Sequence, residues 1–195
     1  NTQKFHAIYR HSKLTGLIDG TDTSILSNIT NIKIRKNFTP TLSSSTKYDI
    51  YFRNALFNPH SGHNMSGGGI LTSTGFKVTG SDVEQFLDDD GNGNVRRYFL
   101  ASGVRSYSDE TQGTINYSTG QITLNSLNVS SISNIRGSSS TNIEITVTPN
   151  SNDIVPVRDQ IVEIDVANSN ITLSPDTFVG GSADAGVGYT TTSSY

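Results

Sequence analysis

The segment DDDGNGNV places acidic and amide side chains at a spacing that is typical of a calcium-binding loop. Asp88, Asp90 and Asn92 occupy the first, third and fifth positions of an EF-hand loop. The twelfth position, where a bidentate Glu should close the coordination shell, is Phe99. Because calcium takes about six or more oxygens, we expect a polar hairpin turn here. A weak calcium site completed by backbone carbonyls and waters stays as the alternative.

Other side chains that could do chemistry lack the partners that such chemistry requires. His60 and His63 lie close together in a glycine-rich loop, but no third ligand for a transition metal is evident nearby. No Ser stands in a nucleophile-elbow pattern, and the pair Asp88 and Asp90 comes without any Trp to bind a sugar ring. We therefore expect a protein that is not an enzyme, and we assign no catalytic residue, no cofactor and no firmly bound metal.

The charge of the chain is close to neutral, with 14 basic and 17 acidic residues and a formal net charge of -3. Arg96 and Arg97 stand beside Tyr98 and could contact a nucleic acid, but phosphate binding depends on clustered basic residues. We expect an ordinary strand with alternating faces there. Neither a nucleic acid nor a membrane is predicted as a partner.

The composition favours strands and turns over long helices. Hydrophobic residues make up 33% and charged residues 16%, and much of the remainder is Ser, Thr, Asn and Gly. Cys is absent, which excludes disulfides and zinc thiolates. The sequence begins at Asn1 and shows neither a secretory leader nor a long apolar run. We expect a piece of a longer protein.

Two short alternating runs around a turn form the clearest element, the segment GTINYSTGQITL at residues 113–124. This pattern predicts a β-hairpin with a glycine in its loop. Upstream, residues 81–99 fit two structures. Ser81 and Glu84 could form the capping box of a short helix, whereas the Asn and Gly residues at 90–94 suit the turn of a second hairpin. We favour the hairpin.

Further strands are expected where apolar residues alternate with polar ones or β-branched residues are dense. These runs are residues 32–35, 48–57, 70–78, 143–147 and 162–166. The fold class that follows is mainly β, with antiparallel, sandwich-like sheets and at most one or two short helices. Whether the sheets form one system or two lobes is open at this point.

The chain divides into three parts on this interpretation. Residues 1–16 are an irregular connector, and residues 17–179 form the β-rich domain. A sub-boundary near residues 105–112 is left open. Residues 180–195 are a tail rich in Gly, Ser and Thr, with too few large apolar residues to form a core element.

Four segments occur in an order that is shared with a known family. They are LIDGTDTSILSNIT, the DDDGNGN turn, GTINYSTGQITL and IEITVTPNSNDIVPVRDQIVEID. Together they resemble the C-terminal region of the baseplate wedge protein of T-even-like, contractile-tailed bacteriophages. The likeness runs from about Leu17 to about Val166.

The resemblance implies a structural virion protein of a phage tail baseplate, assembled in the host cytoplasm. Its partners would be other copies of itself, which join wedges into a ring, and other baseplate wedge proteins. No catalytic residue and no cofactor come with the family. On this chain the resemblance marks residues 153–165 and the hairpin at 113–124 as framework or contact elements.

A different function stays open beside this one. The same Asn-, Ser- and Thr-rich composition suits a calcium-assisted adhesive or carbohydrate-binding β-sandwich of a bacterial surface protein. In that case Asp88, Asp90 and Asn92 would be calcium ligands.

Overall fold

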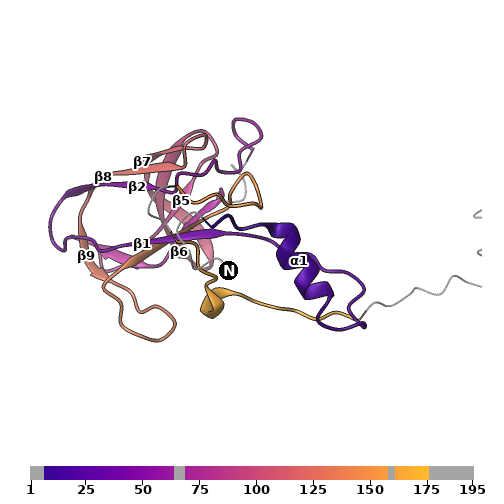
Figure 1. Ribbon diagram of the computed structural model, residues 1–195. Helices are drawn as coiled ribbons and strands as arrows, with labels where there is room; N and C mark the ends of the chain where they lie inside the picture. The colour runs from indigo at the N-terminus through magenta and orange to yellow at the C-terminus, as the bar shows by residue number, and fades with distance from the viewer. Residues whose placement is uncertain (1–6, 64–68, 158–160, 176–195) are drawn as a thin grey trace, which may run out of the picture.

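The computed structural model describes residues 7–63, 69–157 and 161–175, and this part of the chain is mainly β (Figure 1). The expectation of antiparallel sheets with at most one or two short helices is confirmed. None of the described helices has the length and apolar character needed to cross a membrane. The elements are α1 (His11–Asp19), β1 (Ile34–Phe38), β2 (Thr46–Tyr51), β3 (Leu71–Ser73), β4 (Phe76–Val78), β5 (Phe86–Asp89), β6 (Asn94–Ala101), β7 (Val104–Asn116), β8 (Gln121–Leu127), β9 (Val129–Ile132), β10 (Ile143–Val147) and η1 (Val166–Asn168).

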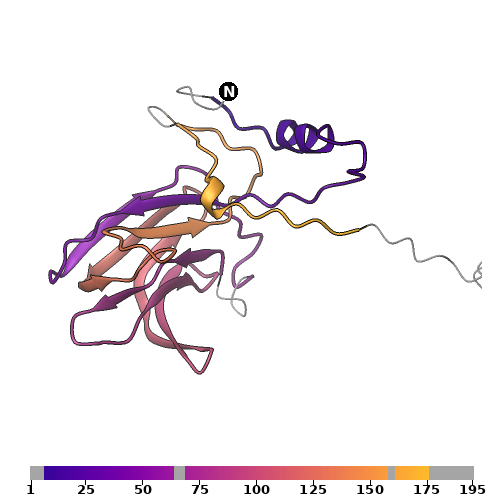
Figure 2. The ribbon, with the colours of Figure 1, turned by 90° about the horizontal axis from the view of Figure 1, so that it is seen from below.

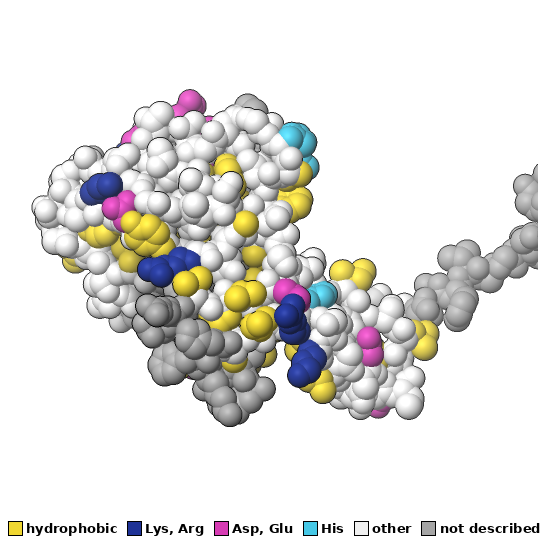
Figure 3. All heavy atoms as spheres, turned by 45° about the horizontal axis from the view of Figure 1, so that its top comes forward, with side chains coloured by type: hydrophobic (Ala, Val, Ile, Leu, Met, Phe, Trp, Pro, Cys, Tyr) yellow, Lys and Arg dark blue, Asp and Glu magenta, His cyan; other side chains and the backbone are white. Residues whose placement is uncertain are grey.

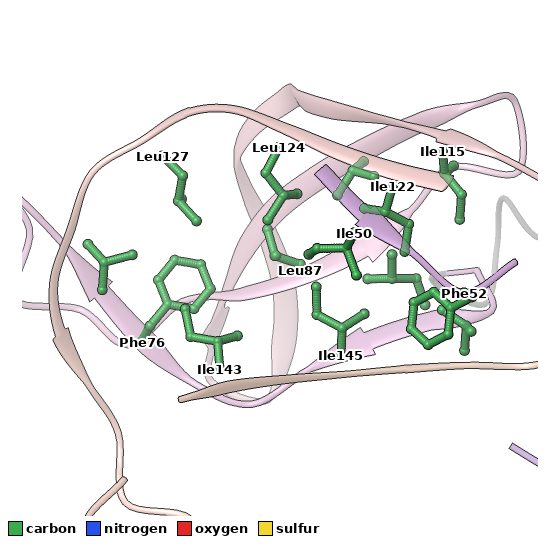
Figure 4. Packing of buried hydrophobic residues seen from close by; sticks show 14 of the residues in the cluster. Ile50, Phe52, Phe76, Leu87, Ile115, Ile122, Leu124, Leu127, Ile143 and Ile145 are labelled. Carbon is green, nitrogen blue, oxygen red and sulfur yellow. The ribbon is translucent and has the colours of Figure 1, made fainter. Parts of the chain in front are cut away.

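The described strands form three antiparallel sheets. A five-stranded sheet has the order β2-β8-β7-β6-β5, a three-stranded sheet has the order β1-β10-β3, and β4 pairs with β9. Their apolar faces meet in one core, in which Leu124 and Ile122 of β8 lie opposite Ile143 and Ile145 of β10 (Figure 4). All four side chains are fully buried. We call this assembly of sheets the body; burial of its apolar surface is the main stabilising contribution.

Both predicted hairpins are confirmed. In the first, β7 and β8 pair with Ile115 opposite Ile122, and the turn between them ends at Gly120 with a φ of 68°. A Cβ at Gly120 would lie 2.3 Å from the carbonyl oxygen of Asn54, so glycine is needed for the close approach as well as for the turn. Tyr117, predicted in the first strand, lies in the turn instead.

The second hairpin joins β5 to β6, with Phe86 opposite Tyr98 and Asp88 opposite Arg96. The helical alternative for this segment is wrong. Ser81 does accept the N–H of Val83, at 3.3 Å, but Gln85 then forms an antiparallel bridge with Phe76 and leads into β5. Pairing with neighbouring strands of the body therefore stabilises this segment as a strand instead of a helix.

Two predicted strands are shorter than their apolar content indicated. The run at residues 48–57 leaves the sheet at Tyr51, and Arg53 then has a φ of 56°. The run at residues 70–78 is divided into β3 and β4 at Gly75, where a Cβ would lie 2.1 Å from Oε1 of Glu84. Residues 105–112, the sub-boundary left open above, lie within β7.

Two segments project from the body on the same side in both ribbon views (Figures 1 and 2). We call residues 7–33 the N-terminal arm and residues 161–175 the C-terminal arm. The N-terminal arm contains α1, so residues 1–16 are not irregular throughout as expected. Helix α1 begins at His11, whose N–H donates to Oδ1 of Asp153 at 2.8 Å, and the side chain of this distant residue thus satisfies one of the free donors of the first turn.

The strand predicted at residues 162–166 is wrong. The described residues from 161 to 165 have no regular secondary structure and pair with no strand, and η1 follows them. Ile164 is 55% exposed and Val166 is 79% exposed. Alternation makes a segment suitable for a sheet, but a strand forms only where a neighbour completes its backbone hydrogen bonds. The predicted tail at 180–195 lies outside the described residues.

Candidate functional site

The candidate calcium ligands Asp90 and Asn92 are occupied by protein donors. Oδ1 of Asp90 accepts the backbone N–H groups of Asn92, at 2.7 Å, and Asn94, at 3.0 Å, while Oδ1 of Asn92 accepts the hydroxyl of Ser61 at 2.6 Å. Burial raises the pKa of Asp90, but the hydrogen bonds from Asn94 and Asn92 outweigh it and leave this pKa below its ordinary value. The segment is the polar hairpin turn that was expected. Among the described residues, no three His, Asp or Glu side chains are placed to hold a metal ion.

Asp88, the third of these candidates, is fully buried at the centre of a charged cluster. Its Oδ1 accepts Nε of Arg96 at 3.0 Å, and its Oδ2 accepts Nη1 of Arg105 at 2.8 Å and the hydroxyl of Tyr107 at 2.9 Å. Burial raises the pKa of this carboxyl, against the Tyr107 hydrogen bond and the two guanidinium groups. The cluster therefore joins β5, β6 and β7 through one carboxylate.

Aromatic rings extend this cluster along the sheet. The guanidinium of Arg96 lies 4.2 Å from the ring centre of Tyr107, and that of Arg105 lies 4.7 Å from the ring centre of Tyr98. Tyr98 in turn stacks on Phe86 at 5.6 Å. Each arginine thus combines an ion pair with a cation–π contact. Arg96 is consequently engaged within the protein rather than presented to a phosphate.

A second buried carboxylate, Asp89, holds the start of β3 against the hairpin. Its Oδ1 accepts the N–H groups of Ile70 and Leu71 at 2.7 and 2.8 Å, and its Oδ2 accepts the hydroxyl of Tyr117 at 2.6 Å. Burial and this bond to Asp89 both raise the pKa of Tyr117. Gly69 is required beside it, because a Cβ there would lie 1.9 Å from Oδ1 of Asp89. Asp89 thus connects the start of β3 to the hairpin of β7 and β8, which is a structural role.

The two loop histidines contact each other. Nδ1 of His63 lies 2.9 Å from Nε2 of His60, and the His63 ring packs edge-on against Phe57. Arg97, paired in the sequence with Arg96, donates its Nε to the hydroxyl of Ser108 at 3.3 Å. In the described part of the chain, the two histidines do not come together with a third His, Asp or Glu that could complete a metal site.

A second charged cluster lies on the three-stranded sheet. Nη1 of Arg35 lies 3.0 Å from Oε2 of Glu144, and Nη2 of Arg136 lies 3.1 Å from Oε1 of the same carboxylate. The C-terminal arm binds to these arginines: Oδ2 of Asp165 lies 2.8 Å from Nη1 of Arg35, and Arg136 donates to Oδ1 of Asn168. We call Arg35, Arg136 and Glu144 the seat, and their contacts with the arm the clasp.

The arm side of the clasp is organised by its own hydrogen bonds. Nδ2 of Asn168 donates to Oδ2 of Asp165 at 2.7 Å, which places both side chains over the two arginines. The hydrogen bond from Asn168 holds the pKa of Asp165 below its ordinary value; burial opposes this effect, and the guanidinium of Arg35 adds to the lowering. A groove of about 400 Å³ borders the clasp and is lined by Arg35, Arg136, Glu144 and Asn168 among others.

The root of the N-terminal arm is held by the first residues of the segment that the resemblance marked. Tyr9 and Ile154 exchange two backbone hydrogen bonds of 2.9 and 3.1 Å, and Arg10 forms a 2.8 Å ion pair with Asp153. The start of the segment 153–165 therefore binds the N-terminal arm, and its end, at Asp165, attaches the C-terminal arm to the seat. Residues 158–160 lie outside the described part of the chain.

The most exposed large apolar side chains among the described residues lie on the two arms, although the body also exposes some, such as Leu100 and Val104. Leu17 and Ile29 of the N-terminal arm are 71% and 93% exposed, and Ile171 and Leu173 of the C-terminal arm are each 87% exposed. Figure 3 shows apolar side chains on the surface of the projecting part of the molecule. The arms thus offer apolar surface that the body does not cover.

A wider groove of about 610 Å³ opens beside the hairpin of β7 and β8. Its lining is polar and uncharged, with the amides of Asn58, Asn92, Asn116 and Gln121 and several hydroxyl groups. Such a surface can hydrogen-bond a neutral ligand, but the lining contains neither a charged group nor a paired nucleophile and base.

Part of this arrangement was accessible from the sequence. Once the turn at residues 90–94 is placed, the hairpin register sets Asp88 opposite Arg96, and their ion pair follows. The contact of Asp88 with Arg105 depends on irregular pairing between β6 and β7, and no local pattern indicated it. The clasp joins Arg35 to Asp165, 130 positions apart, and Arg136 to Asn168, 32 positions apart, so only the fold could bring these side chains together.

Comparisons with known proteins do not identify a family for this chain. No protein-family model matches the chain, and searches of the curated proteins and of the solved structures find no match either.

Proposed function

We propose that this chain is a structural, non-enzymatic assembly domain that associates with other copies of itself. Following the resemblance of its sequence, we place it in the baseplate of a contractile-tailed phage, as part of a wedge protein that helps to join wedges into a ring. Its partners in the virion are then further copies and other wedge proteins.

The observation that carries this proposal is the exposure of large apolar side chains, which is highest on the two arms. Most large apolar side chains of the body lie in one core, and the most exposed ones among the described residues lie on the arms. Leu17, Ile29, Ile171 and Leu173 are 71 to 93% exposed, whereas the most exposed one on the body, Val104, is 69% exposed. Large apolar side chains that are this exposed are candidates for a surface where another protein binds, if they lie together in a patch. Projecting arms suit repeated contacts between identical subunits.

Size-exclusion chromatography with light scattering tests the proposal over a range of protein concentrations. We expect the parent chain to form dimers or larger species. The double variant Ile171→Ser with Leu173→Ser should dissociate at about tenfold higher concentration or more, because interface anchors are commonly large apolar side chains. A strictly monomeric parent at high concentration contradicts self-association.

Val104→Ser is the matched control for this experiment. Val104 is 69% exposed, but it is the first residue of β7, next to the turn that follows β6, and belongs to neither arm. We expect it to leave the association unchanged. Equal losses in Val104→Ser and in the arm variant would contradict a specific role of the arms.

The calcium-assisted alternative has less support from the geometry. Asp88 is paired with Arg96 and Arg105, and Asp90 and Asn92 are occupied as described. Binding of calcium would have to break these contacts. Calorimetric titration with calcium chloride checks this, and heat that is lost in Asp90→Ala would favour the alternative.

A further inference from the structure

We propose that the clasp forms between copies: the C-terminal arm of one copy binds the seat of a second copy. This inference rests on the self-association proposed above and names the surface and the segment that carry it. The occupant is residues 161–175 of the neighbouring chain, with Asp165 and Asn168 as its polar contacts.

The seat has a defined charge and geometry before any arm binds. Glu144, whose side chain is only 11% exposed, holds the guanidinium groups of Arg35 and Arg136 at 3.0 and 3.1 Å. One carboxylate between two arginines leaves a net positive charge and free N–H donors. A segment that presents a carboxylate beside an amide, as Asp165 and Asn168 do, complements this seat.

The arm gains little from binding its own body. None of the described residues from 161 to 175 is buried, and none pairs with a strand. The contacts of the clasp are polar and partly solvated, with the Asp165 side chain 45% exposed. Exposed ion pairs contribute little to stability. An arm held only in this way is released at small cost.

Exchange between copies keeps every contact of the clasp and adds others. The arm of a second copy presents the same Asp165 and Asn168 to the same arginines, so no polar contact is lost. Its apolar side chains, including Ile164, Ile171 and Leu173, can then pack against a neighbouring chain instead of lying 55 to 87% exposed. Reciprocal exchange of an identical element is a recognised route to closed dimers and, if it is not reciprocal, to rings.

Charge reversal distinguishes exchange from a contact within one chain. Copies with Arg35→Glu carry an acidic seat and an acidic arm, and copies with Asp165→Arg carry a basic seat and a basic arm. Each variant alone should associate about tenfold more weakly or worse, because like charges then meet. Mixed in equal amounts, the two variants offer opposite charges at both contacts, and association should return to the parent level.

Lys47→Glu is the matched control, because Lys47 is 61% exposed and pairs with Asp49 on β2, not with the arm. It should associate like the parent. If the two variants associate alone as the parent does, or if mixing restores nothing, the exchange is overturned while self-association stands. A monomeric parent overturns both proposals.

Engineered cysteines give a second readout that does not depend on charge. Because the chain has no Cys, Arg136→Cys and Asn168→Cys each introduce a single thiol. A bifunctional thiol-reactive cross-linker, about as long as the arginine and asparagine side chains that are removed, is added to an equal mixture in which one variant is isotopically labelled. It should give a covalent dimer that links position 136 of one copy to position 168 of the other. Mass spectrometry of the linked peptides identifies it. If the variant with both substitutions closes only within one chain, and the mixture yields no such dimer, the exchange is overturned.

Discussion

Two segments of this chain have almost the same sequence pattern but different structures. Residues 143–147, IEITV, form the central strand β10, whereas residues 162–166, VEIDV, lie in the C-terminal arm. Ile145 is fully buried, and the corresponding Ile164 is 55% exposed. Their acidic residues even meet at the same arginine, since Arg35 contacts both Glu144 and Asp165.

The difference lies in the neighbours of each segment. β10 pairs with β1 on one side and β3 on the other, so both of its edges are hydrogen-bonded and its apolar face enters the core. The described residues of the C-terminal arm pair with no strand. Alternation thus specifies a face that can be buried, and the surrounding strands determine whether it is.

The largest expected effect compares the matched isoleucines. Ile145→Ala leaves a cavity between the sheets and should lower the free energy of unfolding by about 4 kcal/mol. Ile164→Ala should change it by less than about 0.5 kcal/mol at a protein concentration that keeps the chain monomeric, because the side chain is then largely in water. Urea unfolding followed by circular dichroism checks both. Similar losses in the two variants would show that the arm contributes to the core.

Removal of Arg96 tests whether the buried ion pair with Asp88 stabilises the body by an amount comparable to that of apolar packing. Arg96→Ala leaves the fully buried Asp88 with one guanidinium partner fewer and should cost about 3 kcal/mol in the same unfolding experiment. Lys47→Ala is the control, because the ion pair of Lys47 with Asp49 is exposed and should contribute less than about 1 kcal/mol. A loss for Arg96→Ala as small as that of the control would assign the cluster no role in stability.

Glu144 and Asp165 sharpen the comparison at the seat itself. Glu144→Ala removes the carboxylate that holds both Arg35 and Arg136 and should cost about 2 kcal/mol, because two ion pairs near the surface are lost on a central strand. Asp165→Ala should leave the unfolding midpoint of the body nearly unchanged. Thermal unfolding at a protein concentration low enough to keep the chain monomeric compares them. A larger loss for Asp165→Ala would mean that the arm stabilises its own body.

The smallest expected effect is a local response to pH. Because the pKa of Asp165 is lowered by Asn168 and Arg35, its carboxylate supports the clasp fully above the ordinary pKa of Asp, about 3.9. The support is lost as the pH falls through the lowered pKa. We expect the side-chain amide signal of Asn168 to shift in this acidic range in nuclear magnetic resonance spectra, and Asp165→Asn to abolish that shift. A titration at or above the ordinary pKa would contradict the ion pair.

Local elements of the fold were predictable because their signals lie within a few residues. The turn residues at 90–94 and at 117–120 stand between alternating runs, and both hairpins follow from them. Helix α1 was missed, since its first turn is capped by Asp153, a residue far away in the sequence. The position of Asp88 opposite Arg96 was within reach, but its full burial was not, because burial depends on Arg105 and Tyr107 of the next strand.

The sequence by itself determined that this chain is mainly β and where its hairpins turn. It also determined that the acidic segment at residues 88–95 forms a hairpin turn. These properties depend on side-chain periodicity and on the backbone preferences of Gly, Asn and Asp, which act over short distances. Only the tertiary structure decided which alternating segment became β10 and which became an arm. Both could form a strand, but only one reaches a position where two neighbouring strands complete its hydrogen bonds and a core covers its apolar face.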